Sequence, residues 1–592
     1  MASRKRTEII IETDRVLMIR RSPKGDEDLV PGMRQWSGQD RSESSTDPHW
    51  RQVAHPAGAH RKQGRTYFPE SQWSLRVALS VAAFIIPAAA QAGPAVTGVV
   101  NNYSFIPSGY PNSGVAPSSI IAIFGSGMAN APTGPLTLES SAVGIPKSLN
   151  GASISVTVGG KTVMPAMYYA IPTQIAAVLP ADTPIGTGTL TVTYNGSASN
   201  AFPIQVVPSA LGLDTYYGTG SGLITATDAT SGVLFNYTNS ASPGQTITLW
   251  GTGLGADPED SDTVFTMTPH SVNQSMVQVY FGGVPGTVTY AGSSGYPGLD
   301  QINVIVPDPV GCNVAVTAVI GNIPSNFTTA PLAQGGGECS DPLLGITGSD
   351  LSALGGESNV NSGAVFVGQT TATTGGTQMT VNAAIADFRH YPVYPVSSGS
   401  ISVGSCLVTE SPGSSTSSAL NVGTITLMGS GGDYPLMGPE EGLYEATLPN
   451  SAATPGASFT FSWTGGSGVS AASVMVTLPS PFLIWTNESA STTVTRSQGI
   501  QVTWSGGAPG SFVIISGTSS PPGGLATSFV CYAPQSALEF AVPSYVTDLL
   551  PAGTGTLGLV DTMPYRRFTA AGLNGGTAWA SNGNGLSTVK YQ

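Results

Sequence analysis

Short stretches of alternating apolar and polar residues, divided by glycine, proline and asparagine, follow one another from about residue 95 to the end of the chain. In Gln301–Val306 every second residue is Ile or Val, and alternating runs at Ser458–Trp463 and Ile500–Trp504 each lead into a Gly-Gly turn. A period of two places successive side chains on opposite faces of a strand, so one face of each sheet is buried. With turn signals this frequent, the pattern predicts an all-β protein.

A long approximate repeat lies in the first half of this region. The segment Pro117–Met128 returns as Pro243–Leu254, 126 positions later, and each copy reads as a strand that ends in Gly-x-Gly. A repeat unit of this length matches a whole domain rather than a solenoid turn. The glycines of the motif are expected to adopt positive φ and to shape a tight turn after the strand. They are Gly125, Gly127, Gly251 and Gly253.

The repeated residues resemble the IPT/TIG immunoglobulin-like domain. The second copy carries the resemblance through Gly251–Leu254, Gly282–Pro285 and Gln301–Val304, while the first copy departs from it with Ser118 in place of a glycine. The tandem arrangement is similar to one in uncharacterised secreted proteins of Solibacter-type acidobacteria. The resemblance implies two immunoglobulin-like β-sandwiches, over 93–208 and 209–335, and an exported setting. It implies no activity.

Two further β-sandwich regions are expected after the repeat, over 341–480 and 481–592, in a beads-on-a-string arrangement. Tryptophans recur in and near their strands, and these have two interpretations: core residues, which strand tryptophans usually are, or a platform on which sugars stack. The candidates for a platform are Trp463, Trp485 and Trp504, with Trp250 and Trp579 as further aromatic positions.

The charge of the chain is divided between two unlike segments. Of 21 Lys and Arg residues, 14 lie before residue 77, whereas the segment from Gly93 onward carries seven basic against 24 acidic residues. Such a segment lacks the clusters of Lys and Arg that nucleic acids and acidic membranes attract. Nucleic acid is therefore excluded as an expected partner.

An export signal is expected just before the charge-poor segment. Arg76 precedes the apolar stretch Val77–Ala90, and Ala90-Gln91-Ala92 has small residues at the positions that a signal peptidase reads. We expect a signal peptide over 74–92 with cleavage after Ala92, and no membrane span in the mature chain. An uncleaved signal anchor is the alternative, although the apolar stretch is short for a membrane span.

Residues 1–73 do not fit in front of a signal peptide, because an ordinary signal begins with only a few basic residues. The favoured interpretation is a mis-assigned translation start, and a cytoplasmic extension comes second. Within this basic and polar segment, Thr7–Arg20 has the composition of a strand pair.

Four cysteines are consistent with an exported chain. Four cysteines allow three disulfide connectivities. We favour Cys312–Cys339, which closes a short loop across the end of the second repeat, and Cys406–Cys531, which then lies within the C-terminal half. None of the four has the CxxC spacing of a zinc or redox site.

One loop has the composition of a metal site. Asp257, Glu259, Asp260 and Asp262 supply the hard oxygen ligands that Ca²⁺ prefers, but their spacing matches no known calcium loop, which favours a solvated acidic loop. No other cofactor is expected.

Catalytic sets are scarce in the sequence. Only His270 and His390 follow the signal, in different predicted domains, and no Gly-x-Ser-x-Gly elbow occurs between a strand and a helix. Asp387–Tyr391 is interpreted as a salt-bridged turn rather than a catalytic centre. The sequence therefore indicates no enzyme.

The combined expectation is an exported interaction or structural module, secreted or held at the cell surface. Its partner is an unidentified protein or polysaccharide, since sandwich loops commonly carry recognition. The alternative is a secreted glycan hydrolase with its catalytic region in 341–592 and the repeats as accessory domains. That function needs two carboxylates that face one groove.

Export makes the first prediction. Protein recovered from the fractions of the producing cell should begin at Gly93 and contain paired cysteines, because export removes the signal and oxidises the thiols. Mass spectrometry of the N-terminal peptide, together with a non-reducing disulfide map, measures both. An intact Met1 with free thiols would overturn export.

Overall fold

The computed structural model describes residues 6–12, 15–21, 93–131, 136–138, 144–266, 268–342, 344–354, 358–374, 376–393, 401–410, 417–440, 442–521 and 525–592. Across these residues β-strands dominate, so the all-β class is confirmed. The expected strand pair near the N-terminus is present as β1 (Arg6–Glu12) and β2 (Arg15–Arg21). The expected signal peptide, 74–92, lies outside the described residues.

The strands that follow Gly93 form two sheets around one core. One sheet has the order β3-β4-β10-β9, and the other has β12-β11-β7-β6 with β13 and β8 at its side. Alternate residues of β4 and β7, among them Ile123 and Val156, are fully buried between the sheets. The strands are β3 (Ala95–Asn101), β4 (Ile120–Ser126), β6 (Ser148–Leu149), β7 (Ala152–Val158), β8 (Lys161–Val163), β9 (Ala166–Ala170), β10 (Gln174–Val178), β11 (Gly186–Tyr194), β12 (Ser197–Ala198) and β13 (Phe202–Val206), and β5 (Leu136–Leu138) pairs with β1.

A second core lies within residues 211–332. Its sheet has the order β14-β16-β19-β18-β17-β20-β21, with β15 beside β16 and β22 beside β20, and it buries Leu249, Phe281 and Val304. The strands are β14 (Gly212–Leu213), β15 (Ala226–Asp228), β16 (Thr246–Thr252), β17 (Val277–Phe281), β18 (Val284–Tyr296), β19 (Leu299–Ile305), β20 (Gly311–Ile320), β21 (Ile323–Pro324) and β22 (Thr328–Leu332), with the short 3-10 helix η1 (Gln274–Met276) before β17.

The segments that match in sequence also pair alike. In β4 and β10, Phe124 lies opposite Gln174, and in β16 and β19, Trp250 lies opposite Gln301. Each pair joins the apolar run before Gly-x-Gly to the Gln-Ile strand of the same copy.

The glycines of the Gly-x-Gly motif divide into two kinds. Gly127 and Gly253 have φ of 62° and 106°, as expected of turn glycines. For Gly125 and Gly251 the expectation of positive φ is wrong, because both lie within strands, and the reason for glycine there is close approach. A Cβ on Gly125 would lie 2.0 Å from the carbonyl oxygen of Ala95.

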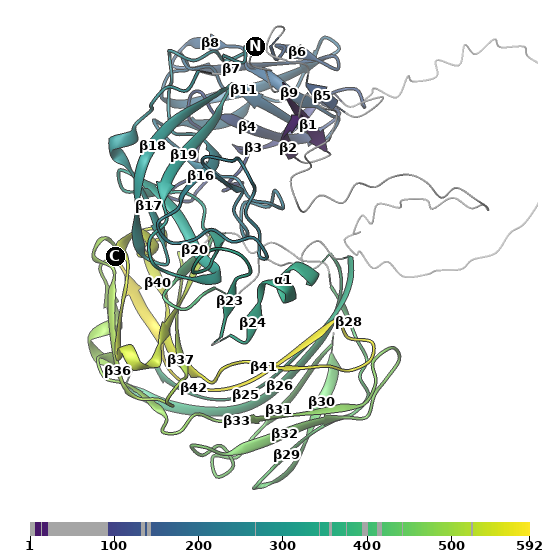
Figure 1. Ribbon diagram of the computed structural model, residues 1–592, viewed down its shortest axis with the longest axis vertical. Coiled ribbons are helices and arrows are strands. Elements are labelled where there is room, and N and C mark those ends of the chain that lie inside the picture. Colours follow the sequence, from purple (N-terminus) through teal and green to yellow (C-terminus); the bar gives the residue numbers. More distant parts are fainter. Residues whose placement is uncertain are drawn as a thin grey trace, which may run out of the picture. The chain divides into compact units, whose positions relative to one another are not determined.

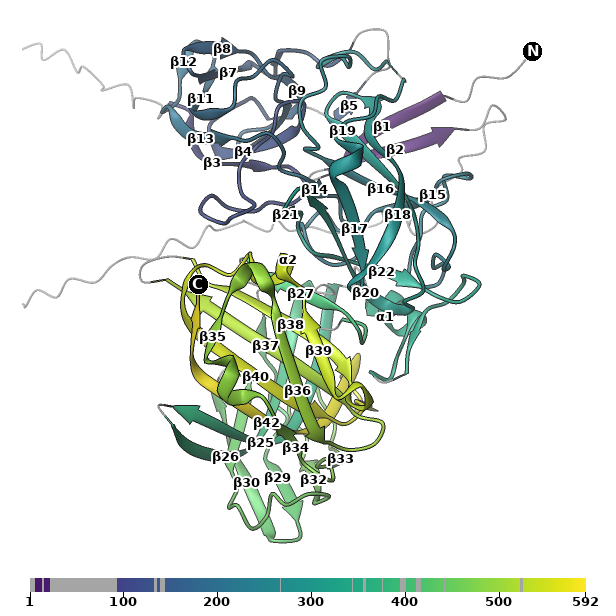
Figure 2. The ribbon, with the colours of Figure 1, turned by 90° about the vertical axis from the view of Figure 1, so that its left-hand side faces the viewer.

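The C-terminal half contains one large sheet, with the order β27-β38-β37-β40-β42-β25-β26-β31-β30-β29-β32-β33 and with β28, β35 and β41 at its side. A separate three-stranded sheet has the order β34-β36-β39, and β23 pairs with β24. Figure 1 shows β42, β25, β26 and β31 next to one another in a curved sheet, and Figure 2 shows β37, β38 and β40 likewise. The strands are β23 (Ser340–Asp341), β24 (Ile346–Thr347), β25 (Ser358–Thr374), β26 (Thr377–Val393), β27 (Cys406–Thr409), β28 (Ser418–Ala419), β29 (Ile425–Gly429), β30 (Gly432–Glu440), β31 (Leu443–Thr447), β32 (Ser458–Trp463), β33 (Ala472–Thr477), β34 (Leu483–Trp485), β35 (Thr493–Val494), β36 (Ile500–Gly506), β37 (Phe512–Ser520), β38 (Thr527–Pro534), β39 (Glu539–Val542), β40 (Gly553–Thr562), β41 (Arg566–Phe568) and β42 (Gly575–Tyr591). Short helices of this half are α1 (Gly348–Leu354), α2 (Ser544–Thr547), η2 (Glu488–Thr492), η3 (Arg496–Gln498) and η4 (Gln535–Ala537).

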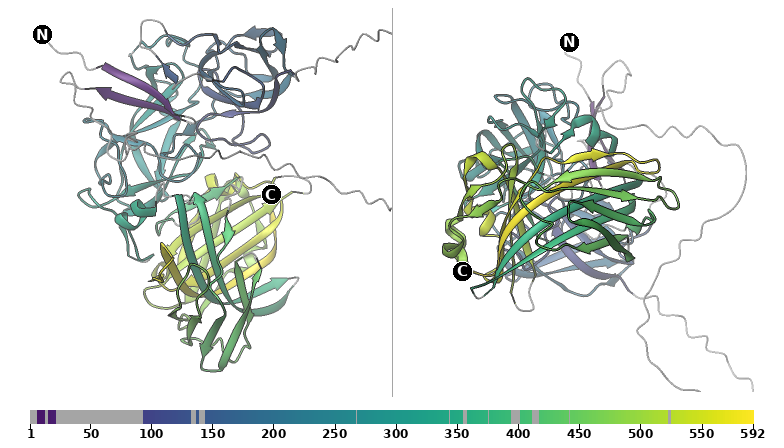
Figure 3. Two further views of the ribbon diagram at one scale, coloured as in Figure 1. Left: turned by 90° about the vertical axis from the view of Figure 1, so that its right-hand side faces the viewer. Right: turned by 90° about the horizontal axis from the view of Figure 1, so that it is seen from below.

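Strand exchange crosses the boundary expected at residue 480. The last long strand, β42, runs parallel to β25 and antiparallel to β40, and Figure 3 shows this yellow strand against teal strands from the middle of the chain. One core takes Ala578 and Ala580 from β42 beside residues 365–478, and the other takes Cys406 and Val408 from β27 beside residues 483–591. Each core of the C-terminal half therefore contains chain from both sides of residue 480.

Removal of β42 tests this dependence. A chain that ends at Asn574 loses the strand between β25 and β40, which leaves two strand edges and two cores open to water. We expect its cooperative urea unfolding transition for the C-terminal half to disappear, measured by tryptophan fluorescence. An unchanged transition midpoint would contradict the pairing.

Candidate ligand-binding face

One face of the curved sheet is covered by a core, whereas described side chains on the other face are partly exposed beside Tyr565 and α1. Along β25, β26 and β42, alternate residues such as Val365, Ala386 and Ala578 are fully buried. The residues between them point to the opposite face, where Met379 and Val381 are 64% and 46% exposed. We call this second surface the open face.

A row of side chains crosses the open face from strand to strand. Trp579 of β42 lies opposite Phe366 of β25, and Phe366 lies opposite Ile385 of β26. The row continues with Glu445 of β31 and Met437 of β30. Met437 is 77% exposed, whereas the two rings are half-buried.

The ring of Phe366 lies flat against the sheet. A Cβ built on Gly368 would lie 2.1 Å from Cζ of Phe366, so the ring occupies the space above that glycine. The Trp579 ring lies beside it, with centroids 5.4 Å apart and planes inclined by 39°. Tyr565 adjoins Trp579 with centroids 5.5 Å apart. Two neighbouring rings therefore form a partly exposed aromatic surface on a rigid sheet.

The charges on the open face largely cancel. Nε of Arg389 donates to both carboxylate oxygens of Asp387, at 2.8 and 2.9 Å. Nη1 of Arg567 lies 3.4 Å from a carboxylate oxygen of Asp350. The exposed Glu445 is the remaining acid of the row. The Asp387–Arg389 ion pair agrees with the sequence, but the expected turn at Asp387–Tyr391 is wrong, because these residues lie within strand β26.

The three tryptophans considered for a sugar platform are core residues. Trp463, Trp485 and Trp504 are 2%, 5% and 3% exposed, so their rings cannot stack on a ligand. Their indole N–H groups donate inside the protein, that of Trp463 to the carbonyl oxygen of Ser470 and that of Trp504 to the carbonyl oxygen of Gln535. These candidates are corrected, and Trp579 is the tryptophan that lies on the open face.

The carboxylates of the acidic loop after β16 accept hydrogen bonds from protein groups inside and outside the loop. Oδ2 of Asp260 accepts from Ser293, and Oδ1 of Asp262 accepts from the backbone N–H of Ala181 at 2.9 Å. Asp257 caps the N–H of Glu259. Among the described residues no three His, Cys, Asp or Glu side chains converge as a metal site needs. The loop therefore contacts the first N-terminal sandwich, since Ala181 lies between β10 and β11.

A buried carboxyl lies behind this loop. Oδ2 of Asp300 accepts from the N–H groups of Gly253 and Leu254, at 2.7 and 2.8 Å. Burial raises the pKa of Asp300 to about 8, even though the two hydrogen bonds act in the opposite direction. Nδ1 of His270 lies 3.7 Å from a carboxylate oxygen of Asp257. This contact is between a histidine and an acid, and it includes no serine, threonine or cysteine that could act as a nucleophile.

Apart from the open face, a surface depression lies over β17, β18 and η1, with a volume of about 810 Å³. Its amide and hydroxyl groups bond to their own neighbours: Gln274 donates to the carbonyl oxygen of Thr289, and Tyr280 donates to Gln278. The ring of Tyr280 stacks on Tyr545 at 4.7 Å. Several polar groups of this depression are therefore engaged within the protein.

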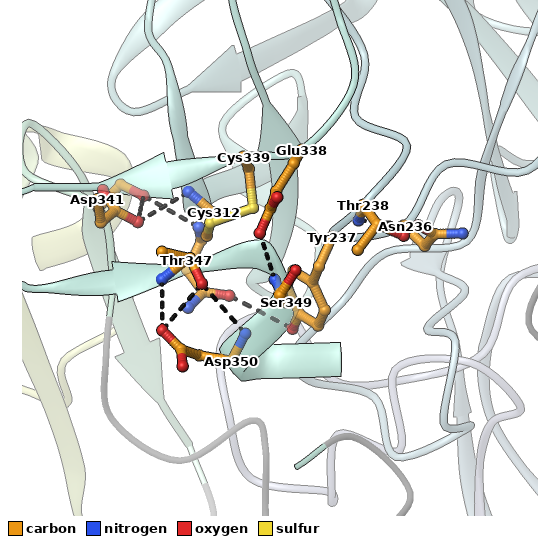
Figure 4. Close-up of a disulfide and its surroundings, with 12 residues drawn as sticks. Asn236, Tyr237, Thr238, Cys312, Glu338, Cys339, Asp341, Thr347, Ser349 and Asp350 are labelled. Carbon is orange, nitrogen blue, oxygen red and sulfur yellow. Dashed lines mark hydrogen bonds between the residues drawn. A yellow bond between two sulfur atoms is a disulfide. The ribbon is translucent and has the colours of Figure 1, made fainter. Parts of the chain in front are cut away.

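Both favoured disulfides are present, Cys312–Cys339 and Cys406–Cys531. Figure 4 shows the first beside Asp341, whose carboxylate accepts from the N–H of Cys312 at 2.7 Å. The second joins directly opposite residues of β27 and β38. Each bridge thus fixes a place where separate segments of the chain meet.

Comparison with known proteins names no family. No family model matches the chain, and no curated protein matches it. Solved structures align only loosely. A Bacteroides ovatus SGBP-B from a mixed-linkage glucan utilisation locus, in complex with a mixed-linkage heptasaccharide, aligns with 11% identity and a TM-score of 0.18, over 57% of this chain and 66% of that chain.

Two further structures align with the same weakness. A Ca²⁺-stabilised, ice-binding adhesin of an Antarctic bacterium has 13% identity and a TM-score of 0.11, over 84% of this chain and 100% of that chain. The surface layer protein SbsC, domains 1–6, has 12% identity and a TM-score of 0.17, over 84% and 55%. At these TM-scores the alignments carry no argument about function.

Sequence reasoning missed Phe366 and Gly368. The run Ala364-Val-Phe-Val-Gly368 is apolar at successive positions, which is the signal of a strand with apolar side chains on both faces. The sequence could not show that one of these faces is open. None of the helices in the described ranges is long and apolar enough to cross a membrane.

The buried Asp300 makes a pH prediction. Its pKa is raised in the folded state above the value near 4 of an unfolded chain, so its contribution to stability is complete at low pH and is lost as the pH rises toward about 8. Urea unfolding midpoints should fall from about pH 5 to about pH 8, and less steeply in Asp300→Asn. Equal slopes in the two proteins would refute the burial of a neutral carboxyl.

Proposed function

We propose that the chain is an exported, all-β interaction protein that binds a polysaccharide at or outside the cell surface through the open face. The observation that carries the proposal is the pair of half-buried rings, Phe366 and Trp579, laid on a sheet whose charges are mostly neutralised. Aromatic faces attract the C–H groups of a sugar ring, and such contacts exclude water from an apolar surface.

The environment of the rings supports a sugar more than a protein partner. Glu445 and the ion-paired Asp387 and Arg389 offer acceptors and donors for hydroxyl groups around the rings. The neighbouring positions Ala364, Gly368 and Ser581 are small, so the Phe366 ring lies flat over Gly368 beside Trp579. Two disulfides support an oxidising location outside the cytoplasm.

The exported setting, the signal peptide over 74–92 and the IPT/TIG character of the two N-terminal cores belong to the same proposal. The matched register of Phe124 with Gln174 and of Trp250 with Gln301 supports tandem copies of one immunoglobulin-like fold. We infer that these copies act as spacers that present the C-terminal half, because the paired rings Phe366 and Trp579 lie in that half.

A glycan hydrolase is the second candidate. The observation in its favour is that Asp387 and Glu445 lie on the same face of neighbouring strands: Asp387 is two residues along β26 from Ile385, which lies directly opposite Glu445. Against it, both oxygens of Asp387 accept from Arg389, which holds this carboxylate in an ion pair. A binding function needs no free carboxylate and accounts for the rings.

The binding test uses the full chain on immobilised neutral glucan, neutral xylan and anionic polygalacturonate. We expect binding to a neutral polymer that Trp579→Ala weakens about tenfold or more, since a few aromatic contacts commonly supply most of the binding energy, and that Trp579→Phe largely keeps. Retention on affinity gels measures this. Met475→Ala is the matched control, because Met475 is 46% exposed on β33, which lies beyond β29 and β32 from the last strand of the row, β30.

The same samples separate the two functions. Release of reducing ends that disappears in Asp387→Asn would establish hydrolysis in place of binding alone. Retention on none of the polymers, or unchanged retention of Trp579→Ala, would refute the binding proposal.

A further inference from the structure

The row of side chains on the open face crosses the strands at right angles to the chain direction. It contains five positions on five neighbouring strands: Trp579, Phe366, Ile385, Glu445 and Met437. Neighbouring strands lie about 4.8 Å apart, so the row extends over about 19 Å. One strand spacing is comparable to the length of one sugar ring in an extended chain.

We propose that the open face binds an unbranched, extended, neutral polysaccharide chain that lies along this row and covers about four sugar units, one for each strand spacing. The inference rests on the proposed function and names its ligand more closely. The rings of Trp579 and Phe366 hold two units, the side chain of Ile385 supports the next, and Met437 contacts the last.

The shape of the surface selects the extended form. The row is continuous from strand to strand because the registers of β42, β25 and β26 place its members directly opposite one another. A helical or branched chain would contact the row at one unit and leave it at the next. A ribbon-like β-linked chain keeps one face of every unit against the sheet.

The charges select a neutral chain. Asp387 is neutralised by Arg389, and Arg567 lies beside Asp350, which leaves Glu445 as the acid of the row. An anionic chain would meet this carboxylate without a free cation in the row to offset it. A neutral chain instead offers hydroxyl groups that donate to Glu445.

The test is the binding of β-1,4-linked gluco-oligosaccharides of two to six units to the full chain, measured by isothermal titration calorimetry. We expect the dissociation constant to fall about tenfold or more from two units to four, and to change less than about twofold from five to six, because contacts end at Met437. Addition of salt should change these constants little, since the ligand carries no charge.

Variants separate the two ends of the row. Trp579→Ala should weaken binding at every length. Met437→Ala should weaken binding of the longer oligosaccharides and leave that of the dimer unchanged, while Met475→Ala changes neither. Both methionines are exposed, so these substitutions leave the cores intact.

Each result decides between the two levels of the proposal. Equal affinity for two and for six units would overturn the proposal of an extended ligand but not polysaccharide binding. The same conclusion follows if the protein is retained on a polysaccharide gel but binds none of the oligosaccharides. Failure of every polymer and oligomer overturns the proposed function itself.

Discussion

The pairing of β42 with β25 and β40 is the interaction on which the C-terminal half depends. This strand carries Ala578 and Ala580 into one core and Leu586, Val589 and Tyr591 into the other, so a single segment completes both. Its parallel partner β25 lies more than 200 residues earlier in the chain. Contacts of such long sequence separation form late and slowly, because the entropy of loop closure is lost before the strand contacts contribute favourable free energy.

The open face also depends on the pairing of β42 with β25. Trp579 is supplied by β42 and Phe366 by β25, and they become neighbours only when the parallel register forms. Both rings then stand on strands whose other faces are buried, which restricts their motion. A recognition surface on paired strands keeps its geometry better than one on a loop, and less ordering entropy is lost on binding.

The sequence predicted the local structure well and the long-range arrangement poorly. Alternation and turn residues identified the strands around Ile302 and Phe461, because these signals are local. They could not identify the parallel partner of β42, since register between distant strands is decided by the assembled core. For the same reason the interpretation of Trp463 as core or platform stayed open until its burial was known. The acidic loop shows a further limit, because Asp262 accepts a hydrogen bond from the N–H of Ala181, which lies between β10 and β11 and is 81 residues earlier in the chain.

The disulfides also connect segments that are distant in the sequence. Cys406 and Cys531 are separated by 125 residues, and their bridge joins the neighbouring strands β27 and β38 of the sheet that contains β42. In the chain-entropy account, closing a loop of that length removes freedom worth about 4 to 5 kcal/mol from the unfolded chain. The shorter bridge, with a separation of 27 residues, removes less conformational entropy from the unfolded chain. It lies beside Asp341, whose carboxylate accepts from the N–H of Cys312. A fold whose central strand comes last in the sequence gains most from a cross-link that keeps its earlier and later segments together, and this favours an oxidising environment for its assembly.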